Sequence, residues 1–88
     1  MAWAINFEAR ADKQLDKLNR HDAAQIVSYL DVIALLDDPR SRGHALVGTM
    51  AGLWRYRVGD WRVVCRIEDR KLVVLVIKIG HRSKSIAS

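Results

Sequence analysis

The stretch "LWRYRVGDWRVVCRI" at residues 53–67 constrains the fold more than any other part of the chain. Side-chain character alternates along two runs, Leu53–Val58 and Trp61–Ile67, which is the pattern of strands with two different faces. Gly59-Asp60 lies between the runs and is a favoured two-residue hairpin turn. The stretch therefore predicts an antiparallel hairpin whose register is set by the turn.

The rest of the chain predicts the elements around this hairpin. Apolar residues at helical spacing predict two helices, which Asn19 or Asp22 would separate by capping the second. A β-branched run without alternation predicts a central strand covered on both faces. The expected elements are a strand at 2–7, helices at 8–18 and 23–36, an irregular connection at 40–52, the hairpin, and a strand at Leu72–Ile79.

This order, β-α-α-β-β-β, predicts a single α+β domain over residues 1–88. Its antiparallel sheet carries a helical hairpin packed on one face, and the first strand joins the same sheet. The other face of the sheet is expected to stay at least partly open.

The expected register separates an apolar face of the hairpin from an arginine face. The aromatic residues fall on the apolar face, so we expect them to pack in the core rather than stack on bases. Arg57 lies directly across from Arg62, with Arg55 diagonal to Arg62, and Arg66 follows on the same face. Like charges directly opposite each other destabilise a sheet, by about 0.2–1 kcal/mol. An anion bound between them would reverse that sign, and guanidinium groups bind phosphate in a bidentate manner.

An alternative explanation is that acidic residues of the helices or of a partner chain neutralise these arginines. The nearby acids Asp60, Glu68 and Asp69 all lie in predicted turns, which disfavours pairing from within the sheet. The arginine face therefore favours a phosphate ligand.

Charge is distributed unevenly along the chain. Residues 1–39 hold four basic and seven acidic residues, a net charge of −3, whereas residues 40–88 hold eleven basic and three acidic residues, a net charge of +8. A basic face of this kind suits nucleic acid or another polyanion, and the lack of a basic amphipathic helix argues against a membrane partner. The single cysteine, Cys65, and the absence of a signal-peptide pattern lead us to expect a cytoplasmic protein.

The exit from the last strand, "GHRSK", adds His81, Arg82 and Lys84 to the basic residues at this end of the sheet. His81 is the one residue there whose ordinary pKa suits proton transfer at neutral pH, although a lone histidine is also a common surface residue. No Cys/His spacing typical of a metal site and no glycine-rich phosphate loop is present, so no metal and no cofactor are expected.

The hairpin motif "GLWRYRVGDWRVVCRI", the apolar strand after it and "GHRSK" resemble the RelE/ParE superfamily of toxins from type II toxin–antitoxin systems, and the RelE branch most closely. The resemblance covers essentially the whole chain. It implies a fold like that of microbial ribonucleases and a metal-independent mRNA interferase. Such an enzyme cuts mRNA in the ribosomal A site by attack of the substrate's own 2′-OH. The positions that the resemblance carries over by motif are Arg55, Arg57, Arg62 and Arg82. Together with the residues that the charge pattern adds, we expect Arg62, His81 and Arg82 to be catalytic, and Arg55, Arg57, Arg66 and Lys84 to bind RNA and phosphate.

The resemblance also implies a cognate antitoxin that covers the basic face. The toxin–antitoxin complex would bind operator DNA only through this antitoxin. One departure stands out: many relatives have a tyrosine where this chain has Ser88. Two alternatives therefore remain open, a ParE-like inhibitor of DNA gyrase and a catalytically weakened RNA-binding relative.

Overall fold

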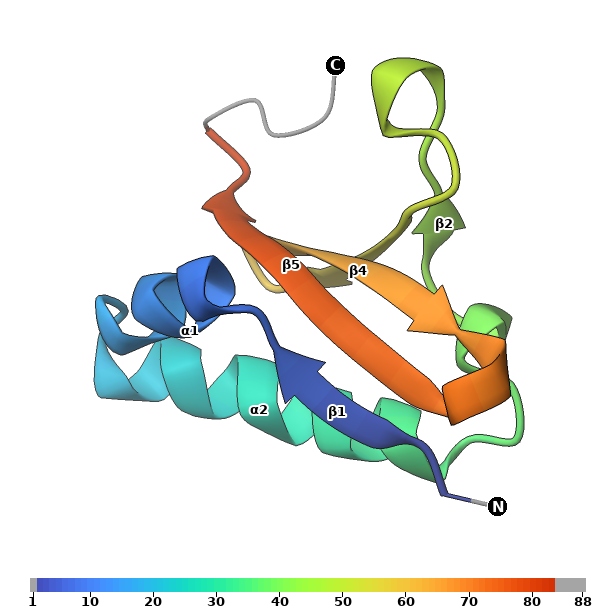
Figure 1. Cartoon of the computed structure of the whole chain (residues 1–88). Helices are drawn as coiled ribbons and strands as arrows, with labels where there is room; N and C mark the ends of the chain where they lie inside the picture. Colours follow the sequence, from blue (N-terminus) through green and yellow to red (C-terminus); the bar gives the residue numbers. More distant parts are fainter. Residues whose placement is uncertain (1, 84–88) are drawn as a thin grey trace.

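Two helices cover one face of a mixed sheet in the computed structural model, which describes residues 2–83 (Figure 1). Within these residues the sheet has five strands in the order β1-β5-β4-β3-β2, with β1 parallel to β5 and every other pair antiparallel. The elements are β1 (Ala4–Phe7), α1 (Ala9–Asp16), α2 (Arg20–Leu35), β2 (His44–Ala45), β3 (Trp54–Val58), β4 (Trp61–Glu68) and β5 (Val73–His81). The predicted α+β architecture, with the first strand in the same sheet, is confirmed. The expectation of an antiparallel sheet holds only for β2 to β5, because β1 pairs with β5 in the parallel direction.

The second helix is anchored by its cap and by its apolar stripe. The side chain of Asn19 accepts a hydrogen bond from the backbone N–H of Asp22 at 2.8 Å, so α2 begins earlier than the expected residue 23. Ile26, Leu30 and Ile33 are buried on the face that packs against the sheet. Neither helix of the described residues is long and apolar enough to span a membrane.

The hairpin has the register that its turn predicts. Val58 pairs with Trp61, Arg57 pairs with Arg62, and Gly59 occupies the left-handed region at φ +58°. The apolar face packs beneath the helices as expected, and Tyr56, Val63 and Cys65 are fully buried there. Tyr56 also donates a hydrogen bond from its hydroxyl to the carbonyl of Pro39 at 2.7 Å, which ties the middle of β3 to the segment after α2.

The connection at residues 40–52 is more ordered than expected. It contains the short strand β2, which pairs with the start of β3, so that β4 and not β5 is the middle strand of the sheet. Its Leu46 covers Val64 on the face away from the helices and, with Met50 and Leu53, forms a second small core. In Figure 1 this excursion between β2 and β3 rises on the side of the sheet opposite the helices. The open face is therefore covered at its centre.

A β-bulge divides β5 into two halves with opposite phase. Val76 pairs with Cys65 and Lys78 pairs with Val64, which leaves Ile77 as an extra residue without a partner on β4. A shift of one residue turns each following side chain to the other face of a sheet.

The hydrogen bonds of β5 agree with this phase change. Beyond the part of β5 that pairs with β1, the N–H of Ile79 points away from β4 and is bound at 2.7 Å by the side-chain oxygen of Gln14 in α1.

Candidate functional site

A small pocket at the turn end of the hairpin collects three arginines. It has a volume of about 130 Å³, and we call it the cation pocket. It is lined by Arg57, Gly59, Asp60, Trp61, Arg62 and Arg82.

The hairpin turn holds these three arginines together. The paired register places Arg57 beside Arg62, and the backbone N–H of Arg82 donates to the carbonyl of Asp60 at 2.8 Å. The Asp60 carboxylate also lies 3.5 Å from Nε of Arg82, so one turn acid does pair with an arginine of the site. Both partners of this ion pair are more than half exposed, and such pairs contribute little to stability. A phosphate can therefore displace the carboxylate at small cost.

The other two arginines of the pocket have no counter-ion within the described part of the chain. No carboxylate of residues 2–83 lies within ion-pair distance of Arg57 or Arg62. The Nε atom of Arg62 is buried without a hydrogen-bond partner, and so is that of Arg55. A buried donor without an acceptor costs about 1–3 kcal/mol. An anion in the pocket would supply both the charge and the acceptor.

Three other basic residues expected at this site lie elsewhere or outside the described residues. Arg55 pairs with Val64 on one side and His44 on the other and does not line the pocket. Arg66 is on the same face but pairs with Leu75, and Val64 beneath Leu46 separates it from Arg62. Lys84 lies outside the described residues, as does Ser88.

His81 lies at the end of β5, and its ring is on the face of the sheet that carries the helices. It pairs with Trp61, and the two rings meet edge to face with centroids 5.1 Å apart, on the side that carries the helices. Its Nδ1 lies 2.7 Å from the hydroxyl oxygen of Ser83 and 3.2 Å from the Ser83 backbone nitrogen, so Ser83 occupies this side of the ring. The pairing with Trp61, which lines the cation pocket, places His81 at the expected edge of the sheet, and the bulge at Ile77 puts its ring on the helix side by inverting the phase of β5 after Val76.

Lys78, and not His81, is the residue of β5 that adds a positive charge to the arginine face. It is half-buried on the open face and pairs with Val64, while Gly80 pairs with Arg62. The sequence reasoning missed this residue. A lone charged residue inside the apolar run "VVLVIKIG" was the available indication, because a lysine in an interior strand must face solvent.

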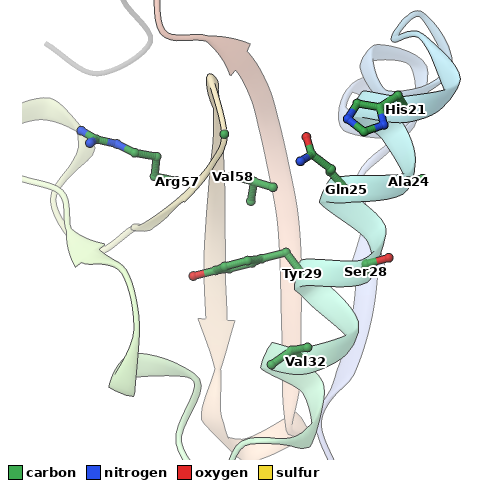
Figure 2. Close-up of a pocket in the computed structure, with 9 residues that line it drawn as sticks. His21, Ala24, Gln25, Ser28, Tyr29, Val32, Arg57 and Val58 are labelled. Carbon is green, nitrogen blue, oxygen red and sulfur yellow. The ribbon is translucent and has the colours of Figure 1, made fainter.

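A larger groove borders the cation pocket. It has a volume of about 630 Å³ and lies between α2 and the end of β3, as Figure 2 shows. Arg57 and Gly59 line both cavities. The α2 wall is partly apolar, with Tyr29 and the exposed Val32. We call this cavity the α2–β3 groove.

Neither a metal site nor an activated thiol is found among the described residues. No group of three or more His, Cys, Asp and Glu side chains in residues 2–83 is arranged to hold a metal ion. Burial raises the pKa of the Cys65 thiol to about 12, which keeps it protonated at neutral pH. Among the described residues, the charged groups that line the cation pocket are three guanidinium groups and the Asp60 carboxylate.

A family model described as "ParE toxin of type II toxin-antitoxin system, parDE" matches residues 5–86. The chain belongs to this toxin family. The RelE branch of the superfamily is represented among its relatives. The chain is 31% identical over 87 residues to the mRNA interferase toxin RelE of Escherichia coli strain K12, covering 97% of this chain and 88% of that protein. It is 34% identical over 83 residues to the toxin RelE of Mycobacterium tuberculosis strain H37Rv, covering 94% and 84%.

Solved structures of the family have the same fold. The toxin–antitoxin complex RelBE2 of Mycobacterium tuberculosis contains a chain that superposes with a TM-score of 0.84 at 25% identity, covering 96% of this chain and 95% of that one. The archaeal RelE–RelB complex of Pyrococcus horikoshii gives a TM-score of 0.76 at 23% identity, covering 97% and 100%. The expected membership in the RelE/ParE superfamily is confirmed.

Proposed function

We propose that this toxin is an mRNA interferase, an endoribonuclease that cuts mRNA in the ribosomal A site. The observation that carries the proposal is the convergence of Arg57, Arg62 and Arg82 on one pocket, where two of them have no counter-ion among residues 2–83. The names of the RelE relatives support the same activity.

The proposed reaction is an internal transesterification. The 2′-oxygen of the substrate attacks the adjacent phosphorus and loses its proton, the bond from phosphorus to the 5′-oxygen breaks, and the leaving oxygen gains a proton. The products are a 2′,3′-cyclic phosphate and a 5′-hydroxyl. The pentavalent transition state carries more negative charge than the substrate, so guanidinium groups around it lower the barrier. Loss of one such donor typically lowers the rate about 100-fold to 1,000-fold.

His81 is not assigned here as the general acid or base. Its ring packs against Trp61, and Ser83 already occupies the Nδ1 side, so only Nε2 is left for a substrate. We expect His81→Ala to leave the pH profile of cleavage unchanged.

A cognate antitoxin is the second part of the proposal. Structural neighbours of this chain are toxin–antitoxin complexes. We propose that an antitoxin segment with apolar and acidic residues lies in the α2–β3 groove and pairs with Arg57. Arg57 lines both cavities, and its guanidinium is directed away from α2 (Figure 2). A segment that continues from the groove across the end of β3 would bring an acid to this guanidinium and take it away from the RNA.

The groove offers a matched pair of variants. Val32 lines it and is 42% exposed, whereas Val27 is 40% exposed on the same helix and does not line it. We expect Val32→Asp to weaken rescue of growth by the co-expressed antitoxin and Val27→Asp to leave rescue intact. Equal rescue of both variants would place the antitoxin elsewhere.

The nuclease proposal is tested by expressing the chain in bacteria without an antitoxin and mapping mRNA ends by primer extension. The wild type, Arg62→Ala and Arg82→Ala are compared, with Arg10→Ala on α1 as the control. Cuts that follow the reading frame, need translation and vanish in the two pocket variants are expected. Growth arrest with intact mRNA and a DNA damage response would instead identify a gyrase inhibitor. Intact mRNA with normal growth would identify a weakened relative.

A further inference from the structure

The bulge in β5 determines which side chains of this strand lie on the arginine face. Val74 and Val76 face the helices, so strict alternation would turn Lys78 toward the helices and His81 toward Arg62. The extra residue Ile77 reverses both placements. Bulges commonly re-aim a side chain beside a functional site.

We propose that Lys78 forms a second phosphate subsite, which binds the RNA backbone one linkage away from the phosphate held in the cation pocket. This inference rests on the proposed nuclease function and adds a substrate contact to it. The proposed subsite is a point charge, because an ammonium group binds phosphate without the fixed geometry of a guanidinium.

The register places Lys78 beside the pocket. Arg62 pairs with Gly80 and Val64 pairs with Lys78, so Lys78 is the diagonal neighbour of Arg62 across two strands. Diagonal neighbours on one face are about 7–8 Å apart, within the reach of long side chains. Gly80 has no side chain, so nothing on β5 stands between the two cations. The cations thus form a row across the open face, from Arg57 on β3 through Arg62 on β4 to Lys78 on β5.

The charge balance around Lys78 favours a ligand over a structural role. No carboxylate of residues 2–83 pairs with its ammonium group, and its partner across the strand pair is the buried Val64. A half-buried cation without a counter-ion does not stabilise a strand. Gln14 stabilises the bulged strand, because its side-chain oxygen accepts a hydrogen bond from the N–H of Ile79, the residue that follows Lys78.

The test measures binding of the folded chain to a short 2′-O-methyl RNA, which has no free 2′-hydroxyl and stays intact. Lys78→Met keeps the apolar stem and removes the charge, and Lys78→Arg keeps the charge. Lys71→Met, an exposed lysine at the other end of β5, controls for net charge. Arg62→Met reports on the cation pocket itself. Circular dichroism and thermal unfolding confirm that each variant is folded.

We expect Lys78→Met to weaken binding about fivefold at low salt, as for the loss of one partly exposed ion pair. The slope of log K against log salt should fall by about 0.7, the value for one phosphate contact with a single strand. Lys78→Arg should restore both quantities, and Lys71→Met should change neither.

The outcomes separate this inference from the function on which it rests. Weaker binding in Arg62→Met with wild-type binding in Lys78→Met would overturn the Lys78 subsite and leave the cation pocket in place. Equal losses in Lys78→Met and Lys71→Met would also overturn it, because general charge would then explain the effect. Unchanged binding in Arg62→Met and Lys78→Met would refute both the pocket and the subsite.

Discussion

Removal of one arginine from the hairpin should make this protein more stable. The register places Arg62 directly opposite Arg57, and the Nε atom of Arg62 is buried without an acceptor. Arg62→Met removes the charge and the unsatisfied donor while it keeps a flexible apolar stem. Arg66→Met is the matched control, because Arg66 lies on the same strand and the same face but pairs with Leu75.

The expected gain follows from these two contributions. Relief of the repulsion contributes about 0.2–1 kcal/mol. Removal of a buried donor that lacks a partner contributes up to about 1–3 kcal/mol, less the packing that the arginine stem provides. We expect the free energy of unfolding to rise by about 1–2 kcal/mol in Arg62→Met. In a domain of this size, 1 kcal/mol raises the melting temperature by about 4–8 °C. Arg66→Met should stay within about 0.5 kcal/mol of the wild type.

Urea unfolding at low and at high salt provides the assay. The difference between Arg62→Met and the wild type should shrink at high salt, because salt screens the repulsion between the arginines. Inorganic phosphate should stabilise the wild type more than Arg62→Met, since it binds the folded pocket. A variant that is less stable than the wild type at low salt, or an equal gain in Arg66→Met, would refute the view that these arginines are kept at the expense of stability.

Three further predictions concern the core and its edges. Tyr56→Phe leaves the carbonyl of Pro39 without its donor and should lower the free energy of unfolding by about 1–2 kcal/mol in urea titrations. Burial raises the pKa of the Cys65 thiol to about 12, so the contribution of this thiol to the free energy of unfolding is fully present below about pH 9. Above that pH the unfolded thiol ionises, and the contribution falls by about 1.4 kcal/mol per pH unit up to about pH 12. Cys65→Val, compared between pH 8 and pH 10, should lack that component of the slope. The Arg40 guanidinium lowers the pKa of Asp69, so Asp69→Asn should melt below the wild type at neutral pH, and the two should converge as acid protonates Asp69.

The hairpin shows what sequence patterning can predict. A two-residue turn at Gly59-Asp60 fixes which residues face each other, and the period of two along each strand assigns each residue to a face. The opposition of Arg57 and Arg62 follows from these two rules alone. The two helices could also be predicted from the sequence, because their apolar residues recur with the period of a helix and Asn19 caps the second one.

The elements that sequence reasoning missed have no periodicity of their own. Strand β2 has two residues, too few for a pattern, and it forms because Leu46 covers Val64 from a distant part of the chain. The bulge at Ile77 falls in a run of apolar residues without alternation, where no phase can be read. The face on which the His81 ring lies and the presence of Lys78 on the arginine face both depend on that one residue.

The most direct test of the nuclease mechanism is a cleavage assay with purified toxin, translating ribosomes and a defined mRNA. The RNA ends are identified chemically, and the wild type is compared with Arg62→Ala on two substrates, one of them 2′-deoxy at the cut nucleotide. A 2′,3′-cyclic phosphate and a 5′-hydroxyl are expected from the wild type, with no cleavage of the 2′-deoxy substrate and a rate about 100-fold to 1,000-fold lower in Arg62→Ala. Cleavage of the 2′-deoxy substrate, or an undiminished rate in Arg62→Ala, would contradict a 2′-OH attack stabilised by the cation pocket.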